Sequence, residues 1–164
     1  MSETPARPRG RWVIAATLLA ALVLAVLPLP EAFAPWRPRW AALILIYWCM
    51  ALPHRVGVGT AWATGLFEDV LTGTLLGQHA LTLAVLAYLV IKLHQRLRLF
   101  PLRQQMLAVL VLLLLGQLLD LWIRGFTGRS PETWAYWGAS LTGTLLWPWV
   151  FTLLRTLRRR LRVT

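Results

Sequence analysis

Six long apolar stretches follow one another along the chain, separated by short polar or proline-containing segments. None of them alternates apolar and polar residues in the way that membrane β-strands do. In lipid every backbone N–H and C=O group needs a partner within the protein, so continuous apolar stretches of this kind predict helices. The sequence therefore predicts an all-α polytopic membrane protein with six transmembrane helices, over residues 12–27, 40–52, 57–76, 80–93, 106–123 and 134–154.

The second stretch, residues 40–52, is the shortest of the six. At roughly 1.5 Å per residue it spans about 20 Å, whereas the hydrocarbon core of a bilayer is about 30 Å thick. On length alone, an arrangement with five crossings stays open.

Lysine and arginine are distributed unevenly between the two predicted faces. With six crossings, 13 of the 17 Lys and Arg residues fall on the face that holds both chain ends, and four fall on the other. Cytoplasmic segments are enriched in these residues, so both termini are predicted to be cytoplasmic. Omitting the second helix would place the basic N-terminal and C-terminal segments on opposite faces of the membrane. The charge distribution therefore favours six crossings. The predicted parts are a cytoplasmic tail over residues 1–11, a membrane domain over 12–154 and a basic cytoplasmic tail over 155–164.

The composition excludes a soluble globular protein. Apolar residues make up 58% of the 164 residues and charged residues 14%, with a mean hydropathy of +0.61. The net charge of +11 could indicate nucleic-acid binding, but the arginines stand at the ends of apolar segments and not on a soluble basic face, so we expect none. We expect these residues to set the topology, and to form a cytoplasmic basic surface for anionic lipids or partners. They are Lys92, Arg96, Arg98 and Arg103, in a loop between the fourth and fifth stretches, and Arg158, Arg159 and Arg160 in the tail.

The third stretch carries two adjacent carboxylates, Glu68 and Asp69. An acidic residue at the centre of a membrane helix costs roughly 2.5 to 3.5 kcal/mol, so each needs a protein or water environment. Small residues recur at every fourth position around Asp69, a spacing that lets another backbone approach closely. Asp69 is predicted on this packing face, where it either bonds a neighbouring helix or contacts a partner or ligand. The ladder consists of Gly57, Ala61, Gly65, Asp69, Gly73 and Gly77, and its last two members form a GxxxG motif through which the chain could self-associate.

The chain lacks the motifs of nucleophilic and metal-assisted catalysis, so we expect no enzyme, cofactor or metal site. Its three histidines are spread over both predicted faces, and Cys49 is the only cysteine. Asp120 and Arg124 stand four residues apart in the order that favours an ion pair within one helix.

Four motifs resemble one known family, the rod-shape-determining membrane protein MreD of the gammaproteobacterial type. They are ALPHRVGVGTAW over residues 51–62, DVLTGTLLGQH over 69–79, KLHQRLRLFP over 92–101 and LWPW over 146–149, before an arginine-rich tail. Glu68 departs from this resemblance, because an apolar residue is expected there in close relatives. The residues that match the family's motif positions are His54, Arg55, Gly57, Gly59, Asp69, Gly73, Gly77, Gln78 and His79.

The resemblance implies a non-enzymatic inner-membrane component of the machinery that elongates rod-shaped bacteria. Members of the family work with MreC, with the MreB filament, and with the RodA glycosyltransferase and its penicillin-binding transpeptidase partner. The family is also similar in fold to the substrate-binding subunits of energy-coupling-factor transporters. We expect a scaffold that binds MreC through helix faces bearing small residues. The alternative is a transporter substrate-binding subunit, in which Glu68, Asp69, Gln78 and His79 line a pocket open to the outside.

Overall fold

The computed structural model describes residues 10–129 and 134–163. Most of the predicted N-terminal tail, residues 1–9, and residues 130–133 ahead of the last helix lie outside them. The described residues form helices and no strand, so the predicted all-α fold is confirmed. The six α-helices are α1 Arg11–Val26, α2 Trp40–Ala51, α3 Val58–Thr72, α4 Gln78–Leu99, α5 Leu102–Phe126 and α6 Gly138–Arg160, and the short 3-10 helices η1 Ala34–Trp36 and η2 Trp134–Trp137 precede α2 and α6.

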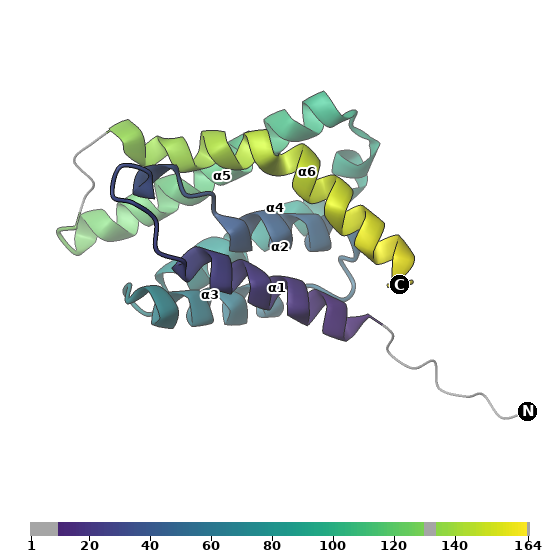
Figure 1. The fold of residues 1–164 in the computed structure, drawn as a ribbon, viewed down its shortest axis with the longest axis horizontal. Coiled ribbons are helices and arrows are strands. Elements are labelled where there is room, and N and C mark those ends of the chain that lie inside the picture. The colour runs from purple at the N-terminus through teal and green to yellow at the C-terminus, as the bar shows by residue number, and fades with distance from the viewer. Residues whose placement is uncertain (1–9, 130–133, 164) are drawn as a thin grey trace, which may run out of the picture.

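The helices lie in three layers along the long axis of the molecule (Figure 1). In that view α1 and α3 form one outer layer, α2 and α4 the middle layer, and α5 and α6 the other outer layer. The helix contacts agree, because α3 packs on α4, α2 on α1 and α4, and α5 on α6. An even number of helices brings the start of α1 and the end of α6 to the same end, where Gly10 packs against Val163.

The short helix α2 is the centre of the core. No side chain from Ala41 to Ala51 is more than 8% exposed. A helix that is apolar on every side is stable only when other helices surround it. The stretch with the weakest length signal in the sequence is therefore the most enclosed helix of the fold.

Two helices of the described chain, α4 with 22 residues and α5 with 25, are long and apolar enough to cross a membrane. Helix α1 is apolar but shorter. Helix α6 ends in a cluster of arginines and has large apolar side chains on its outward face. Four of these recur at intervals of four residues and are between 50% and 69% exposed: Leu141, Leu145, Trp149 and Leu153.

The predicted basic loop between the fourth and fifth stretches is wrong, because most of it is helical. Helix α4 continues to Leu99 and α5 begins at Leu102, which leaves Phe100 and Pro101 as the connection. The ring of a proline disfavours the helical conformation of the residue before it. Phe100, which precedes Pro101, is accordingly extended, with ψ at 136°. The arginines Arg158, Arg159 and Arg160 are likewise helical, since α6 continues through them.

The predicted GxxxG packing motif is also wrong, because α3 ends at Thr72. Gly73 follows it with a φ of +68°, and Gly77 precedes α4 with a φ of +99°. These left-handed conformations are accessible to glycine at little cost and end or start helices. The two glycines form the turn between α3 and α4 and do not offer a helical face for self-association.

The middle of the small-residue ladder packs α3 against α4. A Cβ atom added to Gly65 would lie 2.3 Å from Cα of Ala80, which is closer than two carbon atoms can come. Ala61 and Asp69 are buried on the same face. The absence of a side chain at Gly65 therefore sets the distance between the two helices.

We predict that Gly65→Ala lowers the stability of the purified protein by about 1 to 3 kcal/mol or more, since the added methyl group forces α3 from α4. The matched control is Gly59→Ala in the same helix, where an added Cβ meets nothing within 4 Å. That change should be neutral or slightly stabilising, because alanine favours helix. Thermal unfolding in mild detergent measures both, and equal midpoints for the two variants would contradict the close approach.

Candidate functional site

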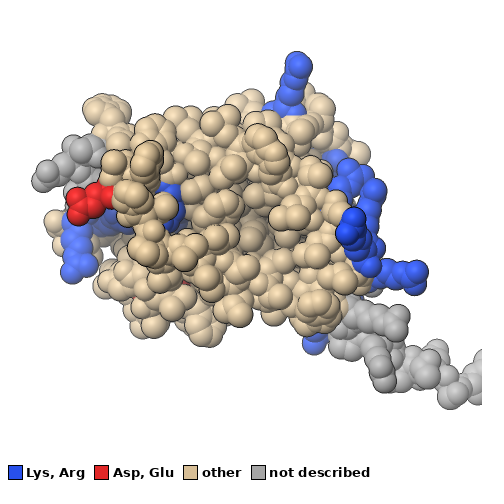
Figure 2. Space-filling model, in the orientation of Figure 1, with Lys and Arg blue, Asp and Glu red and all other residues tan. Residues whose placement is uncertain are grey.

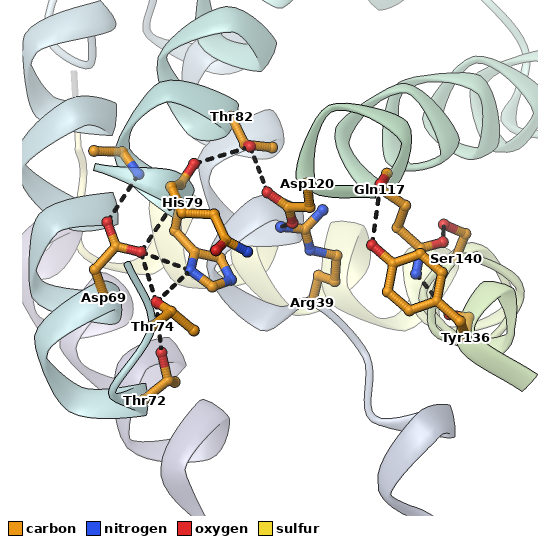
Figure 3. A network of polar contacts seen from close by, with 12 residues as sticks. Arg39, Asp69, Thr72, Thr74, His79, Thr82, Gln117, Asp120, Tyr136 and Ser140 are labelled. Carbon is orange, nitrogen blue, oxygen red and sulfur yellow. Dashed lines mark hydrogen bonds and ion pairs between the residues drawn. The ribbon is translucent and has the colours of Figure 1, made fainter. Parts of the chain in front are cut away.

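The carboxylate of Asp69 caps the first turn of α4. Its Oδ2 accepts hydrogen bonds from the backbone N–H groups of Gly77, at 2.8 Å, and Ala80, at 3.4 Å. Its Oδ1 accepts from the backbone N–H of His79 and the hydroxyl of Thr74, each at 2.9 Å. The first N–H groups of a helix have no partner within the helix and carry positive partial charge, so a buried carboxylate there is stabilising. Figure 3 shows Asp69 reaching from α3 to this turn.

The ring of His79 completes this cap. Its Nδ1 lies 2.8 Å from Oδ1 of Asp69 and 3.3 Å from the hydroxyl of Thr74. Asp69 is only 1% exposed. Of the two roles that the sequence left open for Asp69, the geometry shows a bond to a neighbouring helix. Its packing face is covered by α4 and is not open to a partner.

A second buried cluster joins α2, α4 and α5. Nη2 of Arg39, the residue before α2, lies 2.5 Å from Oδ2 of Asp120. Thr82 of α4 donates its hydroxyl hydrogen to Oδ1 of Asp120, at 2.6 Å. Gly116 leaves room for the guanidinium, since a Cβ there would lie 3.1 Å from Nη1 of Arg39. Burial acts to lower the pKa of Arg39, but the carboxylates of Asp120 and Glu68 outweigh it, and the pKa is raised.

The predicted ion pair between Asp120 and Arg124 is therefore wrong. Asp120 points into the bundle to Arg39, while the Arg124 guanidinium lies 5.6 Å from the ring centre of Tyr136. Spacing along one helix could not reveal this, because Arg39 is 81 residues away from Asp120.

A third cluster joins α5 to η2 and α6. Nε2 of Gln117 donates to the carbonyl of Tyr136 at 2.8 Å, and the Tyr136 hydroxyl donates to the carbonyl of Gln117 at 3.0 Å. Ser140 donates to Oε1 of Gln117. These contacts fix the entry into α6 (Figure 3).

A cavity of about 360 Å³ lies among the three clusters. Its wall includes Glu68 and His79 on one side and Arg39, Asp120 and Tyr136 on the other. Glu68 is 8% exposed, and its carboxylate makes no hydrogen bond or ion pair with any residue that the structure describes. The buried Nη1 of Arg39 also has no partner. The cavity thus offers both a cationic donor and a free carboxylate to a small polar group.

The predicted site residues separate into two ends of the bundle. The cavity end holds Glu68, Asp69, Gly73, Gly77, Gln78 and His79, whereas His54, Arg55, Gly57 and Gly59 lie at the other end, in the turn from α2 and the start of α3. That second end also holds the residues of the predicted basic surface: Lys92, Arg96, Arg98, Arg103, Arg158, Arg159 and Arg160. Nowhere in the described chain do three potential metal-ligating side chains come together.

Sequence reasoning missed most of the polar residues that line the cavity or bond those that line it. Thr82 and Gln117 are single polar residues in apolar helices, and this was the signal that could have singled them out. Arg39 was counted only as a topology charge, because its partners come from distant parts of the chain.

We predict that Asp69→Leu destabilises the protein by at least about 3 kcal/mol, because the backbone donors at the start of α4 lose their acceptor and each unpaired buried group costs roughly 1 to 3 kcal/mol. The neighbouring Glu68→Leu is the matched control and should change stability by less than about 1 kcal/mol. Thermal unfolding in detergent compares the two. Equal effects would show that the Asp69 cap contributes nothing specific.

A double-mutant cycle should couple Asp120 to Arg39 and not to Arg124. For Asp120→Asn with Arg39→Gln we expect an interaction energy of about 1 to 3 kcal/mol, and for Asp120→Asn with Arg124→Gln less than about 0.5 kcal/mol. Chemical denaturation of the single and double variants measures both. A larger coupling to Arg124 would restore the pair within α5.

Comparison with known proteins agrees with the motifs. A family model described as rod shape-determining protein MreD matches residues 6–157. The chain is 35% identical over 153 residues to the rod shape-determining protein MreD of Haemophilus influenzae, covering 93% of this chain and 94% of that protein. No solved structure matches the chain significantly. Because the match extends over nearly the whole length of both proteins, this chain belongs to the MreD family of rod shape-determining proteins.

Proposed function

We propose that this protein crosses the bacterial inner membrane six times, with both termini in the cytoplasm, and acts as a non-enzymatic scaffold of the cell-elongation machinery. Membership of the MreD family implies a role in rod cell shape. In the proposal the chain binds MreC directly. The MreB filament, RodA and its penicillin-binding transpeptidase partner join the same larger assembly. The likeness to energy-coupling-factor substrate-binding subunits remains part of this proposal and concerns the fold alone.

Two features support the membrane placement. The outward faces of the bundle carry large apolar side chains, as along α6, and such patches suit lipid and not water. Most Lys and Arg side chains gather at the end where α1 begins and α6 ends (Figure 2, right). Cytoplasmic segments are enriched in these residues, which favours this end as the cytoplasmic one. The short α2 is enclosed by other helices, so its length need not match the bilayer.

One observation carries the scaffold role: about four-fifths of the described residues lie in the helices, and several of the connections between them are short. The connection from α4 to α5 has two residues, and the turn from α3 to α4 consists of residues 73–77. A partner therefore has to bind at helix faces or at the polar ends. Since α4 covers the ladder around Asp69, we place the contact with the single crossing of MreC on an outward apolar face.

The cavity beside Glu68 favours a second candidate, a substrate-binding subunit of a small-molecule transporter. Its volume and its mixture of unpaired donor and acceptor groups suit a small polar ligand. Only Glu68 and His79 of the four expected residues line it, because Asp69 caps α4 and Gln78 faces elsewhere. The cavity supports ligand binding less well than four converging side chains would.

Purification of the tagged full chain in mild detergent from its native host should recover MreC together with wall-synthesis enzymes, identified by mass spectrometry. Photo-crosslinkers placed at outward positions Phe67, Leu107 and Leu145, one on each of three helices, should capture MreC from at least one of them. The matched control is Leu113, which is buried in the core and should capture nothing.

Two results would overturn the proposal. Recovery of a transport ATPase in place of MreC would favour the transporter reading. Expression of the chain in a rod-shaped host that lacks its own MreD should restore the rod, and round cells that contain correctly inserted protein would contradict the shape role.

A further inference from the structure

A second cavity, of about 420 Å³, lies at the basic end of the bundle. It is formed by the ends of α2, α4, α5 and α6, far along the molecule from the cavity beside Glu68. Six of its wall residues carry the argument: Tyr47, Arg98, Gln105, Phe151, Arg155 and Arg158.

The wall of this cavity is fixed by hydrogen bonds between helices. Nε of Arg98 donates to the carbonyl of Met50 at 2.7 Å, and its Nη2 donates to the carbonyl of Ala51. These carbonyls end α2, where a cation is stabilising. Gln105 donates to the carbonyl of Leu97 at 3.2 Å and accepts from the indole N–H of Trp147 at 3.0 Å. The arginine and the glutamine are therefore held in place before any ligand arrives.

Tyr47 brings a hydroxyl group to the wall of this cavity. The residue is 2% exposed, and its ring packs edge-on against Phe151 with 5.7 Å between the ring centres. The structure shows no hydrogen bond from its hydroxyl to another described residue, so the hydroxyl keeps a donor for a group inside the cavity. Since Tyr47 lines the cavity, a ligand there can accept this hydrogen bond.

The described charged groups around this hydroxyl are cations. Arg158, Arg155 and Arg159 interact electrostatically with the Tyr47 phenol, and Arg98, Arg155 and Arg158 form part of the wall. Among the described residues, no acidic side chain lines the cavity. Three guanidinium groups and a hydroxyl donor form the chemistry that recognises a phosphate group.

We propose that this cavity binds the phosphate headgroup of one anionic membrane lipid. The lipid is favoured over free phosphate because the wall places the apolar side chains of Met50 and Phe151 and the ring of Tyr47 beside the guanidinium groups, so that it suits the apolar part of a lipid as well as its phosphate. Basic pockets between membrane helices on the cytoplasmic side bind anionic headgroups in this way. The inference rests on the proposed membrane placement but not on the contact with MreC.

The test uses the full chain in mild detergent, titrated with phosphatidylglycerol and followed by native mass spectrometry. Phosphatidylcholine with the same acyl chains is the lipid control. We expect one phosphatidylglycerol to be retained in preference to phosphatidylcholine. Arg155→Gln with Arg158→Gln should weaken its binding about tenfold or more, and Tyr47→Phe about threefold.

The matched control is Arg160→Gln with Arg162→Gln, which removes the same charge from the same end of the bundle at two exposed residues that do not line the cavity. This pair should change binding by less than about twofold. Equal weakening by both arginine pairs would show diffuse attraction to surface charge and overturn the site. Displacement of the lipid by equimolar inorganic phosphate would overturn the lipid assignment.

A failure to fold and a loss of MreC binding can both be distinguished from a loss of lipid binding. Tyr47→Phe retains the packed ring, so an unchanged affinity in that variant overturns the role of the hydroxyl even if the double arginine variant fails to fold. MreC recovery is measured in a different experiment, so loss of lipid selectivity leaves the scaffold proposal standing.

Discussion

The fold depends on a carboxylate of one helix that satisfies the backbone donors of the next. Asp69 can reach the first turn of α4 only because Gly65 lets the two helices approach to backbone contact. Away from water, those N–H groups would otherwise stay unpaired, at a cost comparable to several lost hydrogen bonds. The same cap fixes His79 and the turn of residues 73–77, and through them the wall of the cavity beside Glu68. A substitution in this unit therefore alters the helix pair and the cavity together.

The two ends of the bundle differ in the charged side chains that they hold. At the end with the Asp69 cap, buried charges of both signs lie together, since Arg39 pairs with Asp120 and Glu68 lines the same cavity. At the other end the described charged side chains are all cations; Arg98 bonds the carbonyl groups that end α2, and Lys92 lies over the ring of Tyr88. A buried ion pair is satisfied within the molecule, whereas a cluster of cations attracts an external anion. The cavity end therefore balances much of its charge within the molecule, whereas the described charges at the basic end suit an external anion.

The shortness of the connections limits how such a protein can act in a larger assembly. With little chain outside the helices, binding has to use outward helix faces, the ends of the bundle, or both. The sequence predicts that the small-residue face of α3 is an interaction surface. In the structure α4 packs against this face, so it is buried inside the molecule. Small residues at four-residue spacing indicate close helix packing, but they do not distinguish a helix of the same chain from a helix of a partner.

Apolar stretches and motifs in the sequence were enough to predict six helices, an enclosed environment for Glu68 and Asp69, and the family. These features are local, since a helix depends on neighbours three and four residues away and a family motif on consecutive positions. The sequence did not reveal that Gly73 and Gly77 end and begin helices, that residues 94–99 are helical, or that Asp120 pairs with Arg39. The cavity that joins Tyr47 to the arginines of α4 and α6 was equally hidden. Only the tertiary structure decides these points, because each depends on groups far apart in the chain that meet when α2 becomes enclosed.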